Sequence, residues 1–198
     1  LFKAALYCEK RGGEYFLEAI QLHENFIQRY PQNQLVFHAR MRQGDLLRKL
    51  NDFAGAQLIY QNLNYSHPEH PFRYLAELAR ADCLLALAGD EPKAYQDALF
   101  VLEGLIDLPQ LPLDAQAEVG YKWGIALLKQ GRNEEALKVF TQMTGRLLLS
   151  ESTAGSFLDR GQYWLSRTLL EMGKLLKVMG ALDAAQRIYQ KLIACNLP

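Results

Sequence analysis

A short pattern built on alanine recurs five times along this chain. In each copy a larger side chain follows the alanine by four positions and an apolar one follows it by seven. The copies are Ala19-His23-Phe26, Ala56-Tyr60-Leu63, Ala98-Leu102-Leu105, Ala136-Phe140-Met143 and Ala185-Tyr189-Leu192. These offsets place all three side chains on one face of an α-helix. The pattern predicts five helices in which the alanine lets a neighbouring helix approach closely and the larger residue fills the space one turn further on.

A glycine precedes three of these alanines by 12 positions. The pairs are Gly44 with Ala56, Gly124 with Ala136, and Gly173 with Ala185. Turn-forming residues lie inside each pair, at 51–52, 131–133 and 180. Each unit is therefore predicted to contain two helices, of about fourteen residues each.

Prolines mark the ends of the units. Pro31 and Pro68 follow Ala19 and Ala56 by 12 positions, and Pro109 and Pro198 fall one residue from the same register. A proline cannot continue a helix, and it disfavours the helical conformation of the residue before it. We therefore expect helices at 1–10, 14–30, 34–50, 53–65, 72–88, 93–107, 114–130, 133–148, 157–179 and 182–195.

Together these spacings resemble the tetratricopeptide repeat, a helix pair with a period of about 34 residues. The best matches are 37–68, 117–148 and 166–198, although Arg40, Gly120 and Leu169 replace the tryptophan of the family pattern. The resemblance implies an all-α fold, a right-handed superhelical array of antiparallel helix pairs (an α-solenoid) with about five repeats. Residues 1–198 would form a single repeat domain. Successive alanines lie 37 to 49 positions apart, so extra residues are expected in loops at 89–93 and 150–156.

The chain begins at Leu1, inside a predicted helix, and we expect it to be a fragment of a longer protein. The stretch 26–31 followed by 39–45 resembles repeats of bacterial cell-envelope and assembly proteins. The compartment stays open between the bacterial cell envelope or periplasm and the cytoplasm. No segment approaches the roughly 18–20 apolar residues of a membrane span, so no direct membrane insertion of this segment is expected.

The net charge and the spacing of the cysteines argue against a nucleic-acid-binding protein and against a protein held together by disulfide bonds. The chain has 22 basic and 22 acidic residues, and a net charge of zero argues against nucleic acid as a main partner. Cys8, Cys83 and Cys195 lie far apart and outside any CxxC pair, so they are expected to be reduced and buried.

No catalytic motif is present: the sequence lacks G-x-S-x-G, a phosphate-binding loop and a marked pair of carboxylates. His23 occupies the large-residue position of the repeat and is expected in the core. The cluster His67-Pro68-Glu69-His70-Pro71 contains metal-ligand residue types, but its prolines and the lack of a further ligand favour a stiff polar turn. We expect no enzyme activity, no cofactor and no metal.

The resemblance implies that the first helix of each pair lines a concave groove. The positions that would face this groove are His38, Met41, Asp45, Arg48, Lys49, Tyr74, Leu78, Glu118, Tyr121, Lys129, Arg167, Lys174 and Lys177. Some family members clamp a peptide carboxylate with lysine at the fifth position of a unit and asparagine at the ninth. Here the fifth position is Met41, Tyr121 or Leu170 and the ninth is Asp45, Ile125 or Lys174, so this clamp is absent. The mixed apolar and charged lining favours a helix or an extended peptide, although the apolar members could equally pack within the array.

The leading hypothesis is a non-catalytic scaffold that binds a protein or peptide partner in this groove. One alternative is self-association through the apolar ends of the array, Leu1-Phe2 and 193–195, which would give a homo-oligomer. Another is a regulatory or envelope-assembly segment of a larger protein.

Overall fold

The computed structural model describes residues 1–89, 95–106, 108, 110–150 and 159–194. They contain ten α-helices and one short 3₁₀ helix, and no strand occurs among them. The chain divides into two compact units, Leu1–Val101 and Leu102–Pro198, which are described separately. The expectation that 1–198 is one domain stays a prediction.

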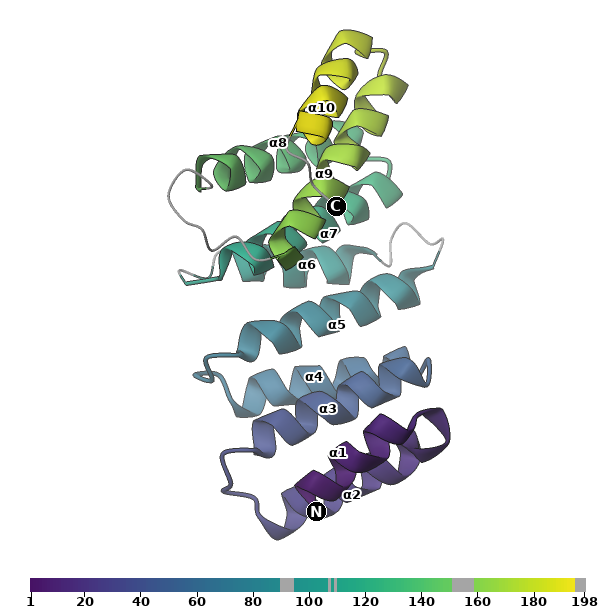
Figure 1. Ribbon diagram of the computed structural model, residues 1–198, viewed down its shortest axis with the longest axis vertical. Coiled ribbons are helices and arrows are strands. Elements are labelled where there is room, and N and C mark those ends of the chain that lie inside the picture. The colour runs from purple at the N-terminus through teal and green to yellow at the C-terminus, as the bar shows by residue number, and fades with distance from the viewer. Residues whose placement is uncertain (90–94, 107, 109, 151–158, 195–198) are drawn as a thin grey trace. The chain divides into compact units, whose positions relative to one another are not determined.

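The helix boundaries fall within two residues of those predicted from the sequence, which confirms the all-α expectation. The helices are α1 (Phe2–Arg11), α2 (Phe16–Arg29), α3 (Val36–Lys49), α4 (Phe53–Ser66), α5 (Arg73–Ala88), α6 (Tyr95–Ile106), α7 (Leu113–Lys129), α8 (Asn133–Ser150), α9 (Asp159–Val178) and α10 (Leu182–Ala194), and η1 (Gly13–Tyr15) is the 3₁₀ helix (Figure 1). The expected loops at 89–93 and 150–156 lie almost wholly outside the described residues, as do Pro109, Cys195 and Pro198.

The turn between the two helices of a pair has the same form in three places. Asn51, Gly131 and Gly180 adopt positive φ angles of 62°, 73° and 79° at the predicted turns. The next residue in each turn donates its backbone N–H to the carbonyl five positions earlier, as in Asp52 to Leu47 at 2.9 Å. This Schellman arrangement satisfies carbonyls at the end of the first helix and reverses the chain. The side chain of Asp52 then caps α4 by accepting the Gly55 N–H at 2.8 Å.

The glycines of the repeat lie beneath aromatic rings. A Cβ on Gly44 would come within 2.5 Å of Tyr60, a Cβ on Gly173 would come equally close to Tyr189, and Gly124 faces Phe140 in the same way. In each pair the ring therefore packs directly on the glycine of the first helix. All five repeat alanines are buried, which confirms their predicted role in close helix packing.

Within the first unit, each helix from α1 to α5 packs against the next one, and Figure 1 shows α3, α4 and α5 in succession. Within the second unit, α7 pairs with α8, α9 pairs with α10, and the first helices α7 and α9 pack against each other. Cys8 and Cys83 are buried, as expected. None of the described helices is long and apolar enough to cross a membrane.

Candidate partner-binding surfaces

Most of the predicted groove residues on α3 already contact neighbouring helices. Tyr60 of α4 donates a hydrogen bond from Oη to Asp45 at 2.7 Å. Burial and the Asp45 carboxylate raise the pKa of Tyr60, so the phenol stays protonated. Arg48 forms an ion pair of 3.0 Å with Asp82 of α5, and the Lys49 ammonium lies 5.3 Å from the centre of the Phe16 ring. These side chains join α3 to three other elements of the first unit.

The remaining predicted positions of the first unit differ in accessibility. Met41 is partly buried against the cluster formed by Phe37, Tyr60 and their neighbours, and Tyr74 is half-buried. Leu78 is only 2 % exposed, so its expected place in a groove is wrong. The alternative that apolar positions pack within the array holds for Leu78.

His38 belongs to a group of aromatic rings where α4 is followed by α5. His70 stacks on Phe37 with ring centres 3.6 Å apart, and the His38 ring lies 5.8 Å from His70. Burial, together with the nearby His38 and His67, lowers the pKa of His70. Within the described part of the chain, no three His, Cys, Asp or Glu side chains are placed to hold a metal ion.

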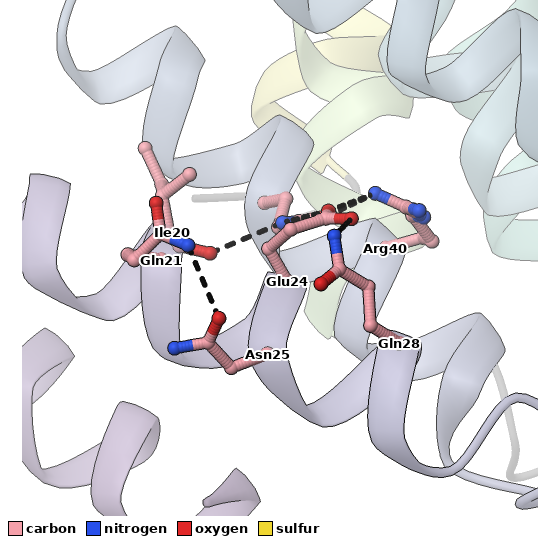
Figure 2. A network of polar contacts seen from close by, with 7 residues as sticks. Ile20, Gln21, Glu24, Asn25, Gln28 and Arg40 are labelled. Atoms are coloured by element: carbon pink, nitrogen blue, oxygen red, sulfur yellow. Dashed lines mark hydrogen bonds and ion pairs between the residues drawn. The ribbon is translucent and has the colours of Figure 1, made fainter.

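A polar network joins the first two helix pairs at the position where the family has tryptophan (Figure 2). Arg40 donates to the Glu24 carboxylate at 2.6 Å, and the buried Gln43 donates to Glu24 and to the Ile20 carbonyl, each at 3.1 Å. Burial opposes ionisation of Glu24, but the hydrogen bonds from Gln43 and Arg40 outweigh it and lower its pKa. Arg40 therefore joins α3 to α2 through an ion pair with Glu24, at the position where the repeat family has tryptophan.

The second unit presents an aromatic and basic surface on α7 and α9, which we call the α7–α9 surface. The Trp164 ring lies 5.2 Å from Tyr121 and 4.9 Å from Tyr163. The Arg167 guanidinium lies 5.6 Å and 5.8 Å from the Tyr121 and Tyr163 rings, and it donates to Tyr121 Oη at 3.2 Å. Tyr121 and Arg167, which were predicted to share a groove, are therefore in direct contact.

The sequence interpretation missed Tyr163 and Trp164. They precede Arg167 by four and three positions, which places them on the same face of α9. The repeat register began at 166, so these residues fell before the counted unit. Counting back three and four positions from Arg167 along the predicted helix would have identified both residues.

A buried ion pair lies beside the Trp164 ring of this surface. Glu118 and Lys122, one turn apart on α7, are 4 % and 6 % exposed and form an ion pair, and Arg160 of α9 also binds the Glu118 carboxylate. The Lys122 ammonium lies 5.5 Å from the Trp164 ring centre. Glu118 was expected to face a groove, and this expectation is wrong because its carboxylate is enclosed by two cations.

Further cations extend along the two helices. Lys174 pairs with Glu171 at 2.8 Å, and this hydrogen bond raises the pKa of Lys174. The hydrogen bond to Tyr121 likewise raises the pKa of Arg167. Lys177 and Lys129 are exposed. The α7–α9 surface thus combines accessible aromatic rings with exposed positive charge.

Comparisons with known proteins agree with this architecture. Residues 38–70 match the family model of the tetratricopeptide repeat. No curated protein matches the sequence. Among solved structures, MamA residues 41 to the end from Desulfovibrio magneticus RS-1 is similar with a TM-score of 0.68 at 19 % identity, covering 97 % of this chain and 90 % of that one.

Two further structures are similar to a comparable degree. A double mutant of MamA from RS-1 gives a TM-score of 0.69 at 18 % identity, covering 97 % of this chain and 90 % of that chain. A putative kinesin light chain with nearly identical TPR-like repeats from Podosopora anserina gives 0.65 at 15 % identity, covering 98 % and 92 %. The chain therefore has the fold of a tetratricopeptide repeat array, and residues 38–70 carry the sequence of one such repeat.

Proposed function

We propose that this chain is a non-catalytic scaffold that binds a peptide or helix of a partner protein on the faces of its first helices. Repeat arrays of this kind offer extended surfaces for protein partners. The α7–α9 surface is the observation that carries the proposal, because it exposes residue types that dominate protein interfaces. Tyr, Trp and Arg are the side chains most enriched among binding hot spots.

The exposure of these rings supports binding over a purely structural role. Tyr163 keeps 43 % of its surface exposed, although its ring contacts Trp164. The ion pair between Arg160 and Glu118 joins α9 to α7 without help from Tyr163. A rigid, amphipathic ring on a fixed helix can bury area on a partner at a low cost in conformational entropy.

Two of the ionisable groups with perturbed pKa values, Tyr60 and His23, lie in the interior. Tyr60, whose pKa is raised, is fully buried and donates to Asp45 within its own helix pair. His23 is also fully buried and binds Glu9 at 2.7 Å. Neither group reaches a surface where a substrate would meet it, so both serve packing between helices.

Capture of proteins from a lysate of the source organism tests the proposal. The immobilised chain is compared with a Tyr163→Asp and Arg167→Asp variant. The matched control, Tyr65→Asp with Arg187→Asp, makes the same changes on exposed positions of α4 and α10. Partners should be lost with the first variant and kept with the control. Equal capture by all three proteins would contradict the proposal.

A second candidate is self-association through the last helix pair. Val178, Leu182 and Ile193 are 80 %, 62 % and 78 % exposed on α9 and α10. Such a set of exposed apolar side chains on one helix pair favours stacking on another array. Sedimentation over a range of concentrations is the test. Concentration-dependent dimers that disappear with Leu182→Glu and Ile193→Glu would support this candidate, and a monomer at every concentration would exclude it.

A further inference from the structure

We infer that the partner segment bound by the α7–α9 surface is acidic and carries apolar side chains. This inference rests on the proposed function and specifies the chemistry of its ligand. It starts from one stripe of α9, where residues spaced by three or four positions share a face. The members of this stripe are Arg160, Tyr163, Trp164, Arg167, Glu171, Lys174 and Lys177.

Positive charge dominates this face. Among its described residues, Glu118 is enclosed by Lys122 and Arg160, and Glu171 pairs with Lys174. Arg167 and Lys177 add two more exposed cations to those three. Five cations therefore face two carboxylates, although the whole chain has a net charge of zero. A surface with this local excess attracts negatively charged segments and repels basic ones.

The aromatic rings set the second requirement. Tyr121, Tyr163 and Trp164 form a continuous group, and the Arg167 guanidinium lies beside two of the three rings. An apolar side chain of the partner would be buried against Tyr163, while its neighbouring carboxylates reach Arg167 and Lys174. A guanidinium also binds a carboxylate with two parallel hydrogen bonds, which an ammonium cannot match.

The length of the stripe sets the length of the ligand. From Arg160 to Lys177 the helix rises by about 26 Å, which an extended peptide of about eight residues spans. The probes are therefore fluorescein-labelled octapeptides in which glutamates alternate with phenylalanines. Three comparison peptides replace all glutamates by glutamine, all glutamates by lysine, or all phenylalanines by alanine. Binding to the intact chain is followed by fluorescence polarisation.

The acidic aromatic octapeptide should bind at least about tenfold more tightly than the glutamine peptide, and its affinity should fall as salt is raised. The Arg167→Glu and Lys174→Glu variant should weaken its binding by about tenfold or more. The matched control, Lys138→Glu with Arg187→Glu on α8 and α10, changes the net charge equally and should leave binding unchanged. Thermal unfolding followed by circular dichroism confirms that both variants fold.

Several results would overturn the inference. Equal binding of the glutamate and glutamine peptides would remove the charge requirement, and equal binding of the alanine peptide would remove the apolar one. Tighter binding of a labelled single-stranded oligonucleotide would assign the surface to nucleic acid, which also stacks bases on aromatic rings. If no octapeptide binds while Tyr163→Asp with Arg167→Asp still abolishes partner capture, the inference fails and the proposed function stands. If that variant leaves capture intact, the proposed function itself fails.

Discussion

The ring of Tyr60 lies over the backbone of Gly44, so that a Cβ at residue 44 would come within 2.5 Å of Tyr60 Cε1. The ring cannot easily move aside, because its hydroxyl donates to Asp45 at 2.7 Å. Two further glycine–ring pairs in the second unit have the same arrangement. The absence of a side chain at these glycines therefore determines how closely the two helices of a pair approach.

Gly44→Ala should destabilise the chain. Overpacking of a core costs about 1–3 kcal/mol, and the better helix propensity of alanine offsets about 1 kcal/mol of that. We expect the free energy of unfolding to fall by up to about 2 kcal/mol, measured by urea denaturation. Gly145→Ala in α8 is the control, since a Cβ there meets nothing within 4 Å. It should stabilise the chain by up to about 1 kcal/mol, and a loss at both sites would contradict the packing explanation.

Asp52→Ala should weaken the start of α4. The Asp52 carboxylate accepts the Gly55 N–H at 2.8 Å, and loss of such a cap costs about 1 kcal/mol. The free energy of unfolding should fall by that amount in urea denaturation. Asp52→Asn keeps a side-chain oxygen at the cap and should restore most of the loss. An asparagine variant as unstable as the alanine variant would show that the cap is not the cause.

Glu118→Gln should be more costly than either substitution above. It leaves the buried Lys122 without its charged partner one turn away, and breaking a buried ion pair in this way costs about 3–5 kcal/mol. Adding Lys122→Met removes the ammonium that Glu118 neutralises and should recover most of the stability in the same denaturation assay. Additive losses in the double variant would argue against coupling between the two side chains.

Acidification should destabilise the first unit through His23. Burial lowers the pKa of His23 below its ordinary value of 6.5, despite the opposing effect of Glu9. The unfolded chain then binds more protons than the folded one, so stability is complete above pH 6.5 and falls as the pH drops below it. The buried Nδ1 has no hydrogen-bond partner among the described residues, which explains why a second proton there is unfavourable.

The midpoint of thermal unfolding at pH 7.5 and at pH 5.5 measures this effect. The native chain should lose stability between these values, and His23→Gln should lose less. His70 contributes in the same direction because its pKa is also lowered. Glu24 does not contribute in this window, since its pKa lies below 4.5. An unchanged pH dependence in the His23→Gln variant would show that His23 is not responsible.

The alanine, glycine and proline spacings were enough to place the helices, because close packing within a pair depends on residues about one repeat apart or less. The same spacings placed His23 in the core correctly. They could not place Leu78 or Glu118, since burial of those side chains depends on how the helices of neighbouring pairs approach. They also could not reveal that Arg48 binds Asp82, 34 positions later, or that Arg160 binds Glu118, 42 positions earlier.

The candidate surface was predictable only in part. Tyr121, Arg167 and Lys174 followed from the resemblance to the repeat family, and two of them are in contact. Trp164 and Tyr163 lie before the first counted position of the last unit, where the spacing between repeats is longest. A register taken from ideal repeats is least dependable beside such an insertion, because the extra residues shift where the helix begins.

The glycine–ring contacts also bear on how the chain reaches its folded state. In all three pairs the glycine and the ring are only 16 positions apart. Contacts of such short sequence separation require little loop closure, and proteins rich in them fold quickly. Each of these pairs can therefore nucleate on its own, and folding can spread from it to neighbouring helices. Because each ring packs on the glycine of its own helix pair, we expect folding to start at different helix pairs and to follow parallel routes.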